Sequence, residues 1–65
     1  MKVVKGAKIL SDLNNDGWYL VHQKGSRRKF KHPVKNGSVT VNGTPSTDFF
    51  GDLLKSIEKQ SGLIF

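Results

Sequence analysis

The chain has 65 residues, enough for one small domain, and its 11 Lys and Arg outnumber 5 Asp and Glu to give a net charge of +6. It contains no cysteine, which excludes disulfides and thiolate metal sites, and its short apolar runs exclude a membrane-spanning helix and a signal-peptide core. We therefore expect a single domain over residues 1–65 in the cytoplasm, with affinity for phosphate backbones or acidic proteins. A domain this small buries only about 60% of its unfolded surface, so its stability depends closely on its apolar core or on a partner.

The first expected element is a helix over residues 5–14. Ile9, Leu10 and Leu13 form its apolar stripe, which Gly6 and Ala7 extend. The sequence Asn-Asn-Asp-Gly at 14–17 ends this helix, because glycine adopts the left-handed backbone conformation that closes many helices.

A strand is expected over residues 18–24, followed by a turn at Lys24-Gly25-Ser26, where Gly25 can supply a positive φ angle. Successive side chains of a strand point to opposite faces of the sheet. Counting from the start of the strand, one face should carry Trp18, Leu20 and His22, and the other should carry Tyr19, Val21 and Gln23.

A second strand is expected over residues 27–32, ended by Pro33, which cannot donate a ladder hydrogen bond. Phe30 is its one large apolar residue, so the face of Phe30, shared with Arg28 and His32, should turn toward the core. The opposite, open face should then carry Arg27, Lys29 and Lys31, which we call the basic row.

The third expected strand covers residues 38–41, with Val39 and Val41 pointing inward, and a second helix covers residues 48–61. The helical spacing is kept by Phe50, Leu53, Leu54, Ile57 and Ser61. Asp48 or Thr47 is the expected cap at the start of this helix, and Gly62 with Leu63 the expected cap at its end.

The element order helix, three antiparallel strands, helix predicts an α+β fold like that of double-stranded-RNA-binding domains, with both helices on one sheet face. The other face stays free. The predicted core is one cluster between the sheet and the helices, made of Leu10, Leu13, Trp18, Leu20, Phe30, Val39, Val41, Leu53, Leu54 and Ile57.

The segment at residues 17–37 holds six of the eleven Lys and Arg, both histidines and three aromatic residues, and it has no Asp or Glu. A basic hairpin of this kind is the electrostatic footprint expected for a polyanion, and the polyanion we expect is RNA. The expected RNA-binding residues are Lys24, Arg27, Arg28, Lys29 and Lys31. The five acidic residues form no cluster in the sequence, so we expect neither a metal site nor a cofactor.

The ordered set GWYLVHQKGSRRKFKHP, GSVTV, the loop with Gly43 and Pro45, and LLKSIEKQSGL resembles the HicA toxins of bacterial toxin–antitoxin pairs over nearly the whole chain. The resemblance implies a small endoribonuclease that cleaves messenger RNA without a metal, and a cognate HicB-like antitoxin that blocks it. It also implies that the catalytic histidine follows Gly25-Ser26 directly.

Here Arg27 stands at that catalytic position. A metal-free ribonuclease needs a group that exchanges a proton near neutral pH, which histidine does and arginine does not. We therefore expect Arg27 to hold a phosphate, and the chain as written to be inactive or impaired as an enzyme.

Two other functions stay open on the residues alone: a non-catalytic small RNA-binding module, and an interaction protein that binds an acidic partner through the same face. The remaining histidines, His22 and His32, are each expected in structural rather than catalytic positions. Ser26 has no basic partner in the sequence and is expected to be a turn residue.

Overall fold

The structure is a computed structural model that describes residues 1–65 as two helices and five strands in two antiparallel sheets. The helices are α1 (Gly6–Asp16) and α2 (Gly51–Ser61). The larger sheet has the order β2 (Tyr19–Lys24), β3 (Arg27–Lys31), β4 (Ser38–Asn42). The smaller one pairs β1 (Val3–Lys5) with β5 (Asp48–Phe50).

The small sheet is the main correction to the predicted topology, which lacked β1 and β5. The observed order is strand, helix, three strands, strand, helix, so the fold is α+β but is not the simple five-element arrangement that was expected. Each missing strand has only three residues, too few to show an alternating pattern. Val4 lies opposite Phe49 in this ribbon, and both side chains are buried, so burial of one apolar pair accounts for the pairing.

The start of the second helix is corrected for the same reason. Residues 48–50 are extended, and α2 begins at Gly51 after Phe50, which makes no side-chain capping bond. Asp48 instead forms an ion pair with Lys5 across the ribbon, with 2.6 Å between Oδ1 and Nζ. The helix ends are as expected: Gly17 and Gly62 follow α1 and α2 in the left-handed conformation.

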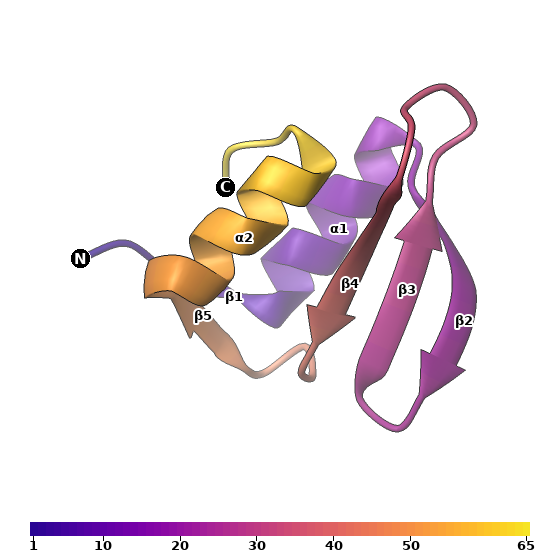
Figure 1. The fold of residues 1–65 in the computed structure, drawn as a ribbon. Helices are drawn as coiled ribbons and strands as arrows, with labels where there is room; N and C mark the ends of the chain where they lie inside the picture. The colour runs from indigo at the N-terminus through magenta and orange to yellow at the C-terminus, as the bar shows by residue number, and fades with distance from the viewer.

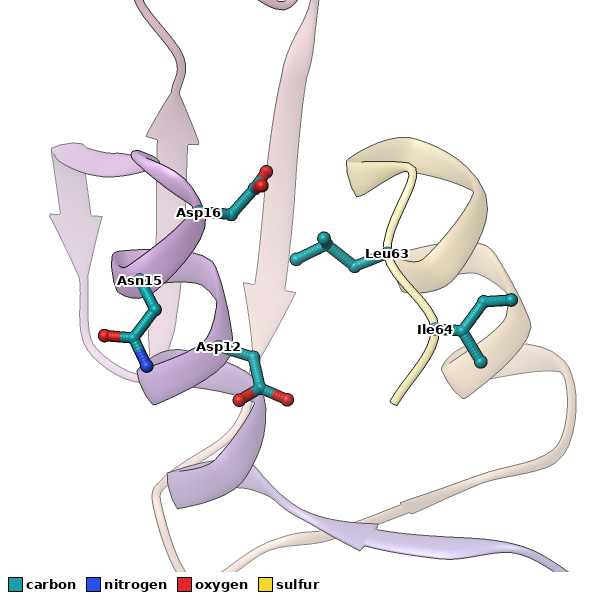
Figure 2. Close-up of a pocket in the computed structure, with 5 residues that line it drawn as sticks. All are labelled: Asp12, Asn15, Asp16, Leu63 and Ile64. Atoms are coloured by element: carbon teal, nitrogen blue, oxygen red, sulfur yellow. The ribbon is translucent and has the colours of Figure 1, made fainter.

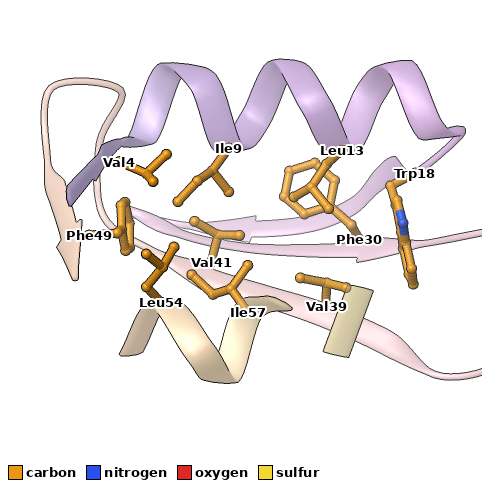
Figure 3. Close-up of a cluster of buried hydrophobic side chains, with 10 residues drawn as sticks. All are labelled: Val4, Ile9, Leu13, Trp18, Phe30, Val39, Val41, Phe49, Leu54 and Ile57. Atoms are coloured by element: carbon orange, nitrogen blue, oxygen red, sulfur yellow. The ribbon is translucent and has the colours of Figure 1, made fainter. Parts of the chain in front are cut away.

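Figure 1 shows α1 and α2 side by side next to the three-stranded sheet, with β2 as the strand farthest from the helices. The buried apolar side chains lie between the helices and the strands, with Phe49 at one end of the cluster and Trp18 at the other (Figure 3). The cluster consists of Val4, Ile9, Leu13, Trp18, Phe30, Val39, Val41, Phe49, Leu54 and Ile57.

The prediction of the core is wrong for two residues. Leu20 is 47% exposed and Leu53 is 50% exposed. Leu20 lies opposite Phe30, but on the edge strand β2, which is the strand farthest from the helices (Figure 1). Phe50, the last residue of β5, is exposed to the same extent as Leu53, whereas Phe49, which the helical pattern had passed over, fills the core. Leu10 packs at the margin of the cluster and is only partly buried.

Candidate nucleic-acid interface

The hairpin of β2 and β3 turns tightly at Gly25 and Ser26. Lys24 lies directly opposite Arg27, so the loop has two residues, and Gly25 has φ of 59° while Ser26 does not have a positive φ. This combination is typical of a type II′ turn, in which glycine is favoured at the first loop position. The Ser26 carbonyl accepts a hydrogen bond of 3.1 Å from the Gly43 amide, which ties the turn to the chain after β4.

A register shift in β2 decides which side chains reach the open face. Leu20 pairs with Phe30 and His22 pairs with Lys29, so Val21 is an extra residue without a partner on β3, as in a β-bulge. Side chains directly opposite each other share a face. Leu20 therefore lies on the inner face with Phe30, while His22 and Lys24 lie on the outer face with the basic row. The predicted placement of His22 beside Trp18 and Leu20 is wrong.

The outer face is hollowed where the three strands meet the turn. A depression of about 280 Å³ is lined by His22, Lys24, Arg27, Lys29 and Thr40, with no apolar side chain among them. We call it the basic hollow. Its residues come from all three strands of the larger sheet, and three of the five are cations. The hairpin register thus brings together residues that are not adjacent in the sequence.

The cations of this face have no acidic partners. Four of the five acidic residues form ion pairs elsewhere: Asp12 with Lys8, Asp16 with Lys35, Asp48 with Lys5, and Glu58 with Lys2. None of the five ion pairs involves Lys24 or the basic row. Four cations without an acidic partner, Lys24, Arg27, Lys29 and Lys31, are therefore gathered on one sheet face, which is a distribution that attracts a polyanion.

Two other cations of the 17–37 segment are separated from this face. Arg28 points to the inner side of β3, is partly buried, and donates a 2.6 Å hydrogen bond to the Gly43 carbonyl. Lys35 reaches the opposite end of the sheet, where its ammonium group contacts the Asp16 carboxylate at 2.7 Å and the Ser61 carbonyl at 3.1 Å. Arg28 is thus placed away from the other four predicted RNA-binding residues.

The second histidine, His32, is held in a closed network. Its Nε2 lies 2.6 Å from the Asp16 carbonyl, and its Nδ1 lies 3.0 Å from the amide nitrogens of both Val34 and Lys35. Because the two amides can only donate, Nδ1 is the acceptor, and the hydrogen-bond pattern assigns the ring proton to Nε2. The ring also packs edge-on against Trp18, with 5.1 Å between centroids.

The Asp16 carboxylate completes this network. It accepts hydrogen bonds from Lys35 and from the Trp18 indole at 3.1 Å. The hydrogen bond from Lys35, with the Lys35 charge and the indole bond as smaller contributions, holds the pKa of Asp16 below its ordinary value of 3.8, although desolvation opposes the shift. His32 and Asp16 together fix the β3–β4 connection to the end of α1, which is a structural role.

A second depression, of about 300 Å³, lies between the end of α1 and the C-terminal segment and is lined by Asp12, Asn15, Asp16, Leu63 and Ile64. Figure 2 shows α1 on one side of it and Leu63 and Ile64 on the other. Both of its carboxylates are already engaged, Asp12 with Lys8 and Asp16 with Lys35. The basic hollow is therefore the better candidate for a functional site.

No three His, Asp or Glu side chains gather as a potential metal site. No helix has both the length and the apolar character that crossing a bilayer requires.

The basic row was predictable from the sequence, because its alternation with Phe30 is regular. The position of His22 was missed, although a signal for it exists. A two-residue turn after Lys24 sets Lys24 opposite Arg27, and counting back from that pair puts His22 opposite Lys29. Counting forward along the strand from Trp18 instead places His22 on the inner face, with Trp18 and Leu20. The bulge at Val21 satisfies both counts, since it restores Leu20 to the inner side.

No curated protein sequence matches this chain significantly. The family model for the HicA toxin of bacterial toxin–antitoxin systems matches residues 6–63, which is nearly the whole chain and includes both helices and the larger sheet. The chain therefore belongs to the HicA toxin family.

Proposed function

We propose that this HicA toxin binds messenger RNA on the outer face of its three-stranded sheet, as the RNA-cleaving component of a toxin–antitoxin pair. One observation carries the proposal: this face holds Lys24 and the basic row without any acidic partner, while four of the five acidic residues are paired elsewhere. Unpaired cations on one face attract the phosphate backbone regardless of sequence.

The predicted RNA contacts divide by position. Lys24, Arg27 and Lys29 line the basic hollow, and Lys31 extends the row along β3. Tyr19 lies opposite Lys31 at the far end of the hairpin and is 51% exposed, so its ring is available to stack on a base. Arg28 serves the fold by binding the Gly43 carbonyl, and we leave it out of the proposed RNA contacts.

The family reaction is metal-independent RNA cleavage, and Arg27 stands where the family has its catalytic histidine. Gly25 and Ser26 form the turn directly before Arg27, and we infer that they set the position of this side chain. Arg27 can hold a phosphate through its guanidinium group, but it stays protonated and cannot act as a general base. We infer that the chain binds RNA on an intact scaffold and cleaves it poorly.

The test is to compare cleavage of one messenger RNA by the natural chain and by Arg27→His, both in EDTA. Arg27→His should cleave about 100-fold faster, which is the low end of what general acid–base catalysis contributes. It should also arrest growth when expressed without an antitoxin. Equal and strong cleavage by both chains would show that Arg27 is not the defect.

A non-catalytic RNA-binding module is the second candidate function, and Arg27 itself is the observation that favours it. In that case neither the natural chain nor Arg27→His would cleave RNA, although both would bind it. Circular dichroism of Arg27→His must show a folded protein for this result to count.

The partner expected for the family is a HicB-like antitoxin. We propose that an acidic segment of it covers the basic hollow, because opposite charges speed association and shield the RNA site. A partner that binds only the folded toxin should raise the melting temperature of the toxin. An interface that leaves Lys24 and the basic row uncovered would contradict direct occlusion.

A further inference from the structure

The exposed histidine of the basic hollow, His22, has no structural role in the fold. The His32 ring is held by hydrogen bonds to backbone groups, and the His22 side chain has no such bonds. His22 lies at the surface on the edge strand β2. It lines the basic hollow together with Lys24 on its own strand, Arg27 and Lys29 on β3, and Thr40 on β4, and no carboxylate lines the same hollow. Stability therefore does not explain a histidine at this position.

We propose that His22 is the proton-exchanging residue of this RNA site, so that the cleavage that remains in the Arg27 chain depends on it. The inference rests on the proposed function, because it assigns a catalytic group within the same site. Position 22 is opposite Lys29, and Lys29 is two residues from Arg27 on β3. His22 and Arg27 are thus diagonal neighbours across the hairpin, for which the typical distance between Cα atoms is about 7–8 Å.

This separation suits a single phosphodiester held between the two side chains. Arg27 and Lys29 can bind the non-bridging phosphate oxygens, because guanidinium and ammonium groups donate charge-assisted hydrogen bonds. The neighbouring ribose 2′-hydroxyl then comes within reach of the His22 ring. Both ring nitrogens of His22 are free to meet it, in contrast to the ring of His32, whose nitrogens are both occupied.

The reaction that these groups support is internal attack of the 2′-oxygen on phosphorus. The neutral His22 ring accepts the 2′-hydroxyl proton as the new bond from oxygen to phosphorus forms. The bond from phosphorus to the 5′-oxygen breaks, and this oxygen takes a proton from solvent, to which the hollow is open. Arg27 and Lys29 stabilise the added negative charge on the phosphate oxygens. The products are a 2′,3′-cyclic phosphate and a free 5′-hydroxyl.

The experiment compares four chains purified in parallel on one messenger RNA transcript in EDTA: the natural chain, His22→Gln, Arg27→His, and the double variant His22→Gln/Arg27→His. The natural chain should cleave about 100-fold faster than His22→Gln, the low end of a general acid–base contribution. Glutamine keeps a polar side chain that can still form hydrogen bonds, so His22→Gln should lose far less RNA affinity than cleavage. Parallel purification gives all four chains the same contaminants.

Two further readouts identify the role of His22. The cleavage rate of the natural chain should rise with pH, as a general base requires, and this rise should be smaller in His22→Gln. The double variant should cleave strongly through the histidine at position 27, which shows that the change at position 22 leaves the scaffold intact.

Three results would overturn the proposal. These are equal cleavage by the natural chain and His22→Gln, no cleavage by the natural chain above the protein-free control, and a loss of RNA affinity in His22→Gln as large as its loss of cleavage. If Arg27→His cleaves in any of these cases, the proposed function stands without His22. If no chain cleaves, both proposals fail and the non-catalytic module remains.

Discussion

The two histidines of this chain lie on opposite sides of the hairpin and differ in their hydrogen bonds and exposure. His32 lies at the inner face with its side chain 9% exposed, both ring nitrogens bonded to backbone groups, and Trp18 against its edge. His22 lies on the outer face among three cations, with its ring at the surface. The difference shows that the register of the hairpin, rather than the residue type, decides whether a histidine stabilises the fold or can contact a ligand.

The same contrast extends to the charged residues. Away from the outer face, four of the five acidic residues form ion pairs with lysines, as in Asp16 with Lys35 and Glu58 with Lys2. On the outer face the cations are unpaired. One face is therefore stabilised by its own contacts, and the other is left for a partner that brings the negative charge.

The largest expected effect is a difference in stability between substitutions at two neighbouring positions of β3, one on each face. Phe30→Ala removes a buried ring from the core and should lower the free energy of unfolding by about 3–5 kcal/mol, enough to unfold many domains of this size. Lys29→Ala, on the outer face, should change it by less than about 0.5 kcal/mol. Urea denaturation of the two variants measures the difference. A mild effect of Phe30→Ala would mean that the assignment of the two faces is wrong.

A comparison of the histidines themselves should give the next largest effect. His32→Ala leaves the Asp16 carbonyl and the Val34 and Lys35 amides without their partner and should cost about 1–3 kcal/mol. His22→Ala should stay within about 0.5 kcal/mol of the natural chain. Thermal melts of both variants test this. Similar losses in the two would contradict the division of roles.

The smallest expected effect concerns the pH dependence of the Asp16 network. Because the folded-state pKa of Asp16 is lowered, chiefly by the Lys35 hydrogen bond, its stabilising contribution is full above 3.8 and is lost as pH falls through the lower folded value. Asp16→Asn should therefore melt at a lower temperature than the natural chain at pH 7, and the gap should narrow below pH 3.8. Asp52→Asn, which removes a carboxylate that forms no ion pair, serves as the control. A gap that stays constant down to pH 2 would refute this account.

The sequence predicted the features that depend on long, regular patterns. The two helices follow from a 3.6-residue period, and the three-stranded sheet and the basic row follow from alternation over four or more residues. The glycines that end the helices are single-residue signals. The ribbon of β1 and β5 was missed because a three-residue strand has no period, and its formation depends on the distant partners Val4 and Phe49. The site was predicted only in part, because one of its two strands also departs from a regular pattern.

A single inserted residue reverses the alternation of a strand, and the bulge at Val21 does this in the middle of β2. The basic row lies on the regular strand β3 and was assigned correctly. His22 lies on the bulged strand and was assigned to the wrong face. Arg28 was grouped with the RNA-binding residues by its charge, whereas its place on the inner side follows from the alternation that identified the basic row.

The central claim is that RNA binds the outer face of the three-stranded sheet, and one pair of double variants tests it most directly. Lys29→Gln/Lys31→Gln removes two charges from that face. Lys55→Gln/Lys59→Gln removes two exposed charges from α2, so the two proteins have the same net charge. Their affinities for one single-stranded RNA are measured over a range of salt concentrations. The outer-face variant should bind more weakly, and its plot of log affinity against log salt should be shallower by about 0.7 per lost phosphate contact, while the α2 variant should match the natural chain. Equal losses of affinity and slope in both variants would mean that RNA responds only to net charge, and would contradict a binding site on this face.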